Sequence, residues 1–141
     1  MRANFMPAMW AGILLFTLCG AATPVLAAPF EDVTREELRA QIDGPAPPLV
    51  LDVRTPEEYA AGHVPGAVNL PHDQTAARIE ELRSYQGRTI VLYCKSGRRA
   101  GIAAEVLAQA GYGPLRHLAG DMPGWIDAGL PVEKTAPESP H

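Results

Sequence analysis

Residues 89–111, TIVLYCKSGRRAGIAAEVLAQAG, contain the signals for a strand, a glycine-bearing loop and a helix, in that order. The apolar run that ends at Tyr93 is the clearest strand signal in the chain. Apolar residues then recur at helical spacing from Ile102 to Ala110, and Gly111 is placed as a C-cap. A strand that leads through a short loop into a helix is the repeating unit of a parallel α/β sheet.

The rest of the sequence continues this alternation after a short leader at residues 28–32. Capping-box patterns begin at Thr34 and Thr55, each with a glutamate three residues later, and predict two helix starts. The pattern therefore predicts an α/β sandwich with a mostly parallel sheet flanked by helices. We expect further strands at 49–53, 67–70 and 115–118, and helices at 34–42, 55–61, 73–85 and 122–128.

Residues 1–27 have the features of a secretory signal peptide. Arg2 supplies the positive start, an apolar run extends to Leu18, and small or short residues precede a cleavage site after Ala27. A transmembrane anchor is the alternative, but glycine and proline interrupt a run that is shorter than the roughly 20 apolar residues needed. Lipidation of Cys19 is disfavoured because Leu18 is too large for such a site. We expect a periplasmic or secreted protein without stable membrane insertion.

Cleavage after Ala27 removes one charged residue and leaves 114 of the 141 residues, with 11 basic and 16 acidic side chains and a net charge of −5. This length fits one domain, placed at 28–133 and followed by a flexible tail at 134–141. The acidic balance argues against a nucleic-acid partner, and we expect a monomer. Cys94 is the one cysteine left, so its thiol is buried, paired with another chain or reactive.

The loop after Cys94 combines a glycine with three cations. Gly97 permits a tight or left-handed turn, which lets the loop amides converge at the positive end of the following helix. Cationic surroundings of this kind lower thiol pKa values from about 8.5 to roughly 3.5–7.5, and the same donors can hold an anion. A lone cysteine is often only a small buried apolar residue, but this combination favours a nucleophile. The candidate nucleophile is Cys94, and the candidate substrate-binding residues are Lys95, Ser96, Gly97, Arg98 and Arg99.

Several motifs together resemble a single-domain rhodanese over about residues 30–132. They are LDVR at 51–54, PEEY at 56–59, GHVPGAVNLP at 62–71, YCKSGRR at 93–99 and GDMPGW at 120–125. The last is similar to the family's Gly-Gly-x-x-x-Trp ending, but Asp121 replaces the second glycine and leaves the geometry of that turn open. The resemblance implies the three-layer sandwich of the rhodanese fold.

The resemblance also implies sulfur transfer. Cys94 matches the family's nucleophile, which attacks the outer sulfur of thiosulfate, releases sulfite and becomes a persulfide. A thiophilic acceptor such as cyanide or a thiol then removes the sulfur. This chemistry requires no organic cofactor and no metal.

Two other functions remain as alternatives. One is a persulfide carrier that hands sulfur only to a protein partner, since it needs the same loop. The other is a cysteine-dependent phosphatase or arsenate reductase, which uses Cys-x5-Arg. Here Arg98 and Arg99 follow Cys94 after three and four residues, and the loop is one residue short for a phosphoryl group.

The remaining polar candidates have structural explanations. Asp52 and Arg54 are predicted to form an internal ion pair or loop brace, with Glu58 as a further candidate partner for Arg54. His63 is predicted to have a hydrogen-bonded structural role, although it could act as a base for Cys94. The other histidines lack the spacing of metal ligands, which argues against a zinc site. They are His72, His117 and His141.

Overall fold

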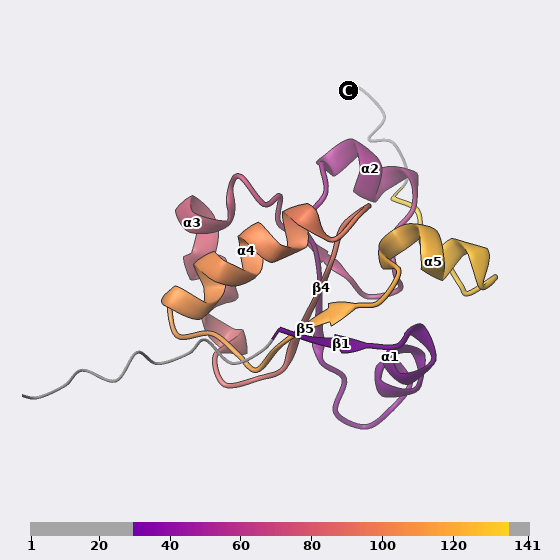
Figure 1. The fold of residues 1–141 in the computed structure, drawn as a ribbon, viewed down its shortest axis with the longest axis horizontal. Coiled ribbons are helices and arrows are strands. Elements are labelled where there is room, and N and C mark those ends of the chain that lie inside the picture. The colour runs from indigo at the N-terminus through magenta and orange to yellow at the C-terminus, as the bar shows by residue number, and fades with distance from the viewer. Residues whose placement is uncertain (1–29, 136–141) are drawn as a thin grey trace, which may run out of the picture.

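The computed structural model describes residues 30–135, so the predicted signal peptide and residues 136–141 of the predicted tail lie outside the described residues. Five parallel strands form one sheet in the order β1-β5-β4-β2-β3, as Figure 1 shows in part. This confirms the predicted parallel α/β fold. The strands are β1 (Glu31–Val33), β2 (Leu49–Asp52), β3 (Val68–Asn69), β4 (Ile90–Tyr93) and β5 (Leu115–Leu118).

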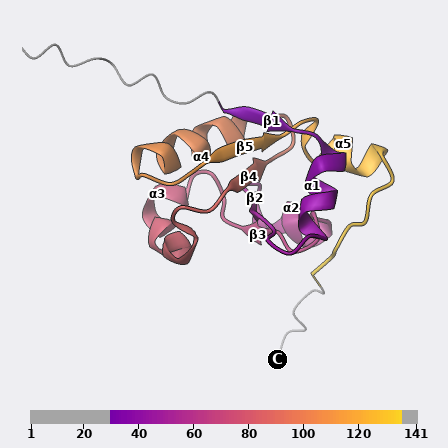
Figure 2. The same cartoon turned by 90° about the horizontal axis from the view of Figure 1, so that it is seen from below.

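Helices cover both faces of the sheet, so the fold has three layers. The helical elements are α1 (Arg35–Ile42), α2 (Pro56–Ala61), α3 (Thr75–Arg78), the 3₁₀ helix η1 (Ile79–Tyr85), α4 (Arg98–Gln109) and α5 (Asp121–Asp127). Figure 2 shows α3 and α4 on one side of the sheet and α1, α2 and α5 on the other. Thr34 and Thr55 close the two predicted capping boxes, each accepting a hydrogen bond from the backbone three residues on.

The central strands β2 and β4 are buried on both faces because their side chains alternate between two cores. Leu51 and Leu92 pack with α4 on one face, whereas Val50 and Val91 pack with Leu38 of α1 on the other. The continuous apolar runs in the sequence follow from this double burial.

Two elements differ from the sequence prediction. The predicted leader at 28–32 overlaps β1 (Glu31–Val33), an edge strand that pairs Val33 with Leu118 of β5. With three residues, β1 is too short to show an alternating pattern. The helix predicted at 73–85 is divided into α3 and η1. Ile79, Leu82 and Tyr85 all contact the same core. Their spacing of three residues matches the three residues per turn of a 3₁₀ helix.

Parallel strands bring their carboxyl ends to one edge of the sheet. The Cys94 loop leaves the sheet at this edge, next to the end of β2. Within residues 30–135, the structure has no helix long and apolar enough to cross a membrane.

Candidate active site

Cys94 follows directly after β4 and lies at the start of the loop that leads into α4. Cys94 is fully buried, with an exposed fraction of 0%. Gly97 is the N-cap of α4 and adopts a φ of +85°, which is the left-handed region predicted for it. In this conformation the Gly97 N–H donates a hydrogen bond to Cys94 Sγ over 3.0 Å. The turn therefore aims a backbone donor and the positive end of a helix at the sulfur.

The three loop cations have different surroundings. Lys95 and Arg98 are exposed, as is Ser96. Arg99 instead forms a two-pronged ion pair with Glu58 of α2, over 2.7 and 3.0 Å. These hydrogen bonds raise the pKa of Arg99, and the adjacent Cys94 adds to the effect. Arg99 thus links α2 to the cysteine loop, while Lys95 and Arg98 face solvent.

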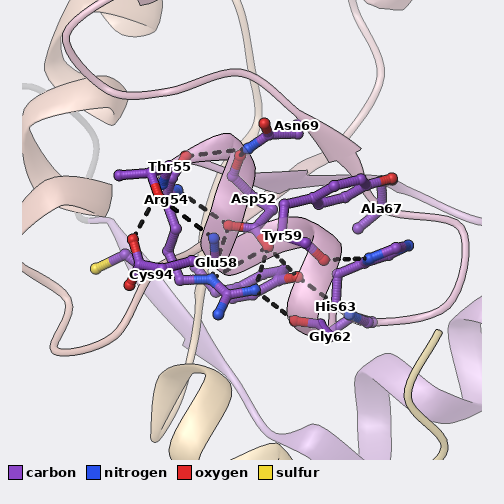
Figure 3. A network of polar contacts seen from close by, with 12 residues as sticks. Asp52, Arg54, Thr55, Glu58, Tyr59, Gly62, His63, Ala67, Asn69 and Cys94 are labelled. Carbon is purple, nitrogen blue, oxygen red and sulfur yellow. Dashed lines mark hydrogen bonds and ion pairs between the residues drawn. The ribbon is translucent and has the colours of Figure 1, made fainter. Parts of the chain in front are cut away.

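Asp52 and Arg54 form the predicted internal brace beneath the loop (Figure 3). The Arg54 guanidinium donates to Asp52 over 2.6 Å and to the Gly62 carbonyl over 2.8 Å. Tyr93 also donates to Asp52, over 2.7 Å, and burial raises the pKa of its hydroxyl. The proposed Arg54–Glu58 pair is wrong, because Asp52 and Gly62 engage Arg54 and leave Glu58 to Arg99.

His63 is held by the chain around α2. Its Nδ1 lies 2.8 Å from the Tyr59 carbonyl oxygen, and its ring stacks on the Tyr59 ring with centroids 3.7 Å apart. Its backbone pairs with Glu133 in an isolated antiparallel bridge. These contacts agree with the hydrogen-bonded structural role that the sequence predicts for His63.

The structure adds Asp121 and His117 to the site, and sequence reasoning missed both. The backbone N–H of Cys94 donates to Asp121 Oδ1 over 2.9 Å, and His117 Nε2 lies 3.0 Å from the same oxygen. Asp121 adopts a φ of +53°, so the turn survives the replacement of the family's glycine. The available signal was that departure itself, because an aspartate in a left-handed position brings a carboxylate that glycine lacks.

Among residues 30–135, no group of three or more His, Cys, Asp or Glu side chains is arranged to hold a metal ion.

Replacing Glu58 with glutamine is expected to make the stability of the fold less sensitive to acid. Hydrogen bonding to Arg99 is the main cause that lowers the pKa of Glu58 from 4.5 to about 2. A carboxylate whose pKa is lower in the folded state stabilises the fold above its unfolded pKa, and this contribution is lost as the pH falls through the folded pKa. The relevant window is therefore from about pH 4.5 down to about pH 2. Partial exposure of the pair reduces the size of the effect through solvent screening.

Urea unfolding of the wild type and Glu58→Gln measures this difference at a series of pH values. The two stabilities are expected to converge as the pH falls through the window. Glu57→Gln is the matched control, because Glu57 is an exposed neighbour in the same helical turn. A difference between wild type and Glu58→Gln that stays constant with pH would contradict the pairing.

The fold and the loop together define a class of protein: an α/β domain with a cysteine cradled between a central strand and a helix N-terminus. A model of the rhodanese-like domain matches residues 34–128. The chain belongs to the rhodanese-like domain family. This match confirms the resemblance to rhodaneses that the sequence motifs indicate.

The chain is also similar to curated proteins from several bacteria. The chain is 36% identical over 107 residues to a sulfurtransferase of Allochromatium vinosum, covering 76% of this chain and 96% of that protein. It is 37% identical over 70 residues to the thiosulfate sulfurtransferase PspE of Escherichia coli, covering 50% of this chain and 67% of PspE. An HTH-type transcriptional regulator of Mycobacterium tuberculosis is 40% identical over 119 residues, which is 83% of this chain but only 51% of the regulator.

Solved structures have the same fold. The crystal structure of a rhodanese-related protein from Thermoplasma volcanium superposes with a TM-score of 0.65 at 26% identity. The match covers 74% of this chain and 98% of that one. The match, which covers almost the whole of the Thermoplasma volcanium chain, confirms the rhodanese fold expected from the sequence motifs.

Proposed function

We propose that this protein is a sulfurtransferase that moves the sulfane sulfur of thiosulfate through a persulfide on Cys94 to a thiophilic acceptor. In the first step, the Cys94 thiolate attacks the outer sulfur of thiosulfate. The new S–S bond forms as the bond to the sulfonate sulfur breaks, and sulfite leaves with that electron pair. In the second step, cyanide or a thiolate takes the outer sulfur and Cys94 is released as thiolate.

The observation that carries this proposal is the Gly97 N–H aimed at Cys94 Sγ over 3.0 Å at the start of α4. A backbone donor and a helix N-terminus stabilise negative charge on the attacking sulfur and on the persulfide. Lys95 and Arg98 are exposed beside this point and supply positive charge for an anionic donor. The relatives named as sulfurtransferases support the same chemistry.

The principal alternative is a persulfide carrier that loads sulfur but releases it only to a protein partner. The discriminating experiment incubates the purified protein with thiosulfate and cyanide, follows thiocyanate, and records the intact mass. An enzyme turns over and gains about 32 Da, the mass of one sulfur, on Cys94. A carrier gains the same mass with negligible turnover. The absence of both thiocyanate and mass gain would refute sulfur transfer from thiosulfate.

The loop length favours sulfur transfer over the phosphatase or arsenate reductase alternative. Arg98 and Arg99 lie closer to Cys94 in sequence than the Cys-x5-Arg pattern requires, and Arg99 is engaged by Glu58. Fewer residues are therefore available to enclose a tetrahedral oxyanion.

We further propose that the protein acts as a monomer in the periplasm or outside the cell, after cleavage at Ala27. Its partners would be a small anionic sulfur donor and a thiophilic acceptor, without nucleic acid. The signal-peptide pattern at 1–27 supports the location. N-terminal mass analysis of protein recovered from the export fraction tests the cleavage site.

Replacing Arg98 with alanine is expected to weaken thiosulfate use more than it weakens reaction with the neutral reagent iodoacetamide. Arg98 is exposed at the first position of α4, so its loss removes positive charge from the donor's approach. We expect kcat/KM for thiosulfate to fall about threefold to tenfold, a range appropriate for one partly screened charge.

The alkylation rate of Cys94 by iodoacetamide is measured in parallel. Arg78→Ala is the control, because this arginine is paired with Glu81 on a different helix. Equal losses for thiosulfate and iodoacetamide in Arg98→Ala would indicate general activation of the thiol instead of donor binding.

A further inference from the structure

Three side chains from separate elements form a chain of polar contacts that ends at the Cys94 backbone. Asp32 Oδ1 of β1 lies 2.8 Å from His117 Nδ1 of β5. His117 Nε2 lies 3.0 Å from Asp121 Oδ1 at the start of α5, and this oxygen accepts the Cys94 N–H over 2.9 Å. Asp121 is only 5% exposed.

Two of these side chains, His117 and Asp121, lie directly under the Cys94 loop. A side-chain carbon placed on Gly97 would lie 3.3 Å from His117 Nε2 and 3.4 Å from Asp121 Oδ2. The His117–Asp121 pair is therefore in contact range of the residue whose N–H points at the sulfur. Any change in its charge acts on the loop and on Cys94 at short range.

The geometry determines the charge of His117. An ionised carboxylate only accepts hydrogen bonds, so an imidazole with both nitrogens facing carboxylate oxygens carries a proton on each nitrogen. The hydrogen bond to Asp121 is accordingly the main cause that raises the pKa of His117 above 6.5. Burial raises the pKa of Asp121, but the hydrogen bonds from His117 and Cys94 outweigh it and lower that pKa. The pair thus consists of one cation and one anion.

The positive charge of His117 matters because the buried Asp121 carboxylate, left uncompensated beside Cys94, would oppose attack by the thiol on an anionic reagent. It would disfavour a thiolate at Cys94 and repel an anionic reagent. The other charged groups around the loop are Lys95 and Arg98, which are exposed, and Arg99, which is paired with Glu58. Asp32 faces His117 from β1, but its side chain is 66% exposed and therefore screened by solvent.

We propose that Asp121 and His117 are a positioning pair for Cys94, in which Asp121 holds the Cys94 backbone and the His117 imidazolium cancels the Asp121 charge. This inference rests on the proposed function in one respect only: thiosulfate is the anion that the pair would otherwise repel. The pair itself is a property of the loop, and it can be tested without any sulfur transfer.

The test compares alkylation of Cys94 by iodoacetate, an anion, with alkylation by iodoacetamide, a neutral reagent of nearly equal size. The ratio of the two rate constants cancels thiol ionisation and access to the buried sulfur, and reports the local charge. It is measured from about pH 5 to about pH 9 for the wild type, His117→Gln, Asp121→Asn and the double variant. Asparagine retains an acceptor oxygen and tolerates a positive φ, so Asp121→Asn removes the charge with little change of shape. Asp127→Asn, an exposed position at the end of the same helix, is the control.

The wild-type ratio is expected to fall as the pH rises through the raised pKa of His117, because deprotonation leaves Asp121 uncompensated. In His117→Gln the ratio is expected to be about tenfold lower than the wild type near pH 5, and independent of pH. The double variant regains the wild-type value measured near pH 5, because removing both charges restores neutrality. Asp127→Asn follows the wild type throughout.

A double variant no better than His117→Gln would overturn the proposal, since a purely structural role gives no rescue. If His117→Gln does not fold, Asp121→Asn decides the question alone, because its pair is neutral at alkaline pH. Its ratio there must match the wild-type ratio near pH 5, and a ratio as low as that of the wild type at alkaline pH refutes charge cancellation. Failure of thiosulfate to load Cys94 while these ratios behave as expected would refute the proposed donor and leave the pair intact.

Discussion

Cys94→Ser is expected to eliminate persulfide formation and to reduce thiocyanate production from thiosulfate and cyanide by on the order of 10³-fold or more. Serine nearly matches cysteine in size, so it fits the fully buried position at the end of β4. Its hydroxyl is not ionised near neutral pH and is a poor nucleophile toward sulfur. The Gly97 N–H then has an acceptor but no thiolate to stabilise.

The measurement combines the thiocyanate assay with intact mass. Wild-type protein gains one sulfur after thiosulfate treatment, and Cys94→Ser stays at its original mass. Ser84→Ala, on the exposed side of η1, serves as the control and should behave as the wild type. Undiminished turnover in Cys94→Ser, with native circular dichroism, would remove Cys94 from the reaction.

Arg54→Ala is expected to destabilise the fold by about 3–5 kcal/mol, the usual cost of removing one partner from a buried ion pair. The side chains of Arg54 and Asp52 are 8% and 0% exposed. Without the guanidinium, the Asp52 carboxylate stays buried next to the Tyr93 hydroxyl and loses its matching charge. For a domain of about 100 residues, this loss corresponds to a fall in Tm of more than about 10 °C.

Thermal and urea unfolding measure the loss. Arg83→Ala is the matched control, because Arg83 is paired with Glu80 on η1 with both side chains largely exposed. We expect little change there, since exposed ion pairs contribute weakly to stability. Similar losses in Arg54→Ala and Arg83→Ala would show that burial of the Asp52–Arg54 pair has no special cost.

The parts of the fold that could be predicted from sequence are those whose signals are local. The apolar runs of β2 and β4 and the capping boxes at Thr34 and Thr55 each depend on residues a few positions apart. The three-residue strand β1 has no such signal, because its existence depends on a neighbour more than 80 positions away in sequence. The pairing of β1 with β5 is set by the tertiary structure, so no local sequence pattern predicts it.

The candidate site likewise has parts that local sequence patterns predict and parts that depend on contacts between distant residues. Cys94 and the left-handed turn at Gly97 follow from a contiguous strand–loop–helix pattern. The pairing of Arg99 with Glu58 joins residues 41 positions apart, and the contact of His117 with Asp32 joins residues 85 positions apart. Neither pair shares a periodic pattern, so residue type alone could not match the partners. The replacement of a family glycine by Asp121 is visible in the sequence, but there it raises only the geometry of a turn and not the contacts of Asp121 with His117 and Cys94.

The complete burial of Cys94 has a consequence for which reagents can reach its thiol. With 0% of the residue exposed, Cys94 lies out of reach of the flat face of another protein, and small, slender reagents are expected to react with it more readily. In the proposed sulfur transfer, a macromolecular acceptor would therefore need to carry its thiol on a narrow projection such as a flexible tail. A disulfide between the Cys94 residues of two copies of this chain would likewise require the loop to open first.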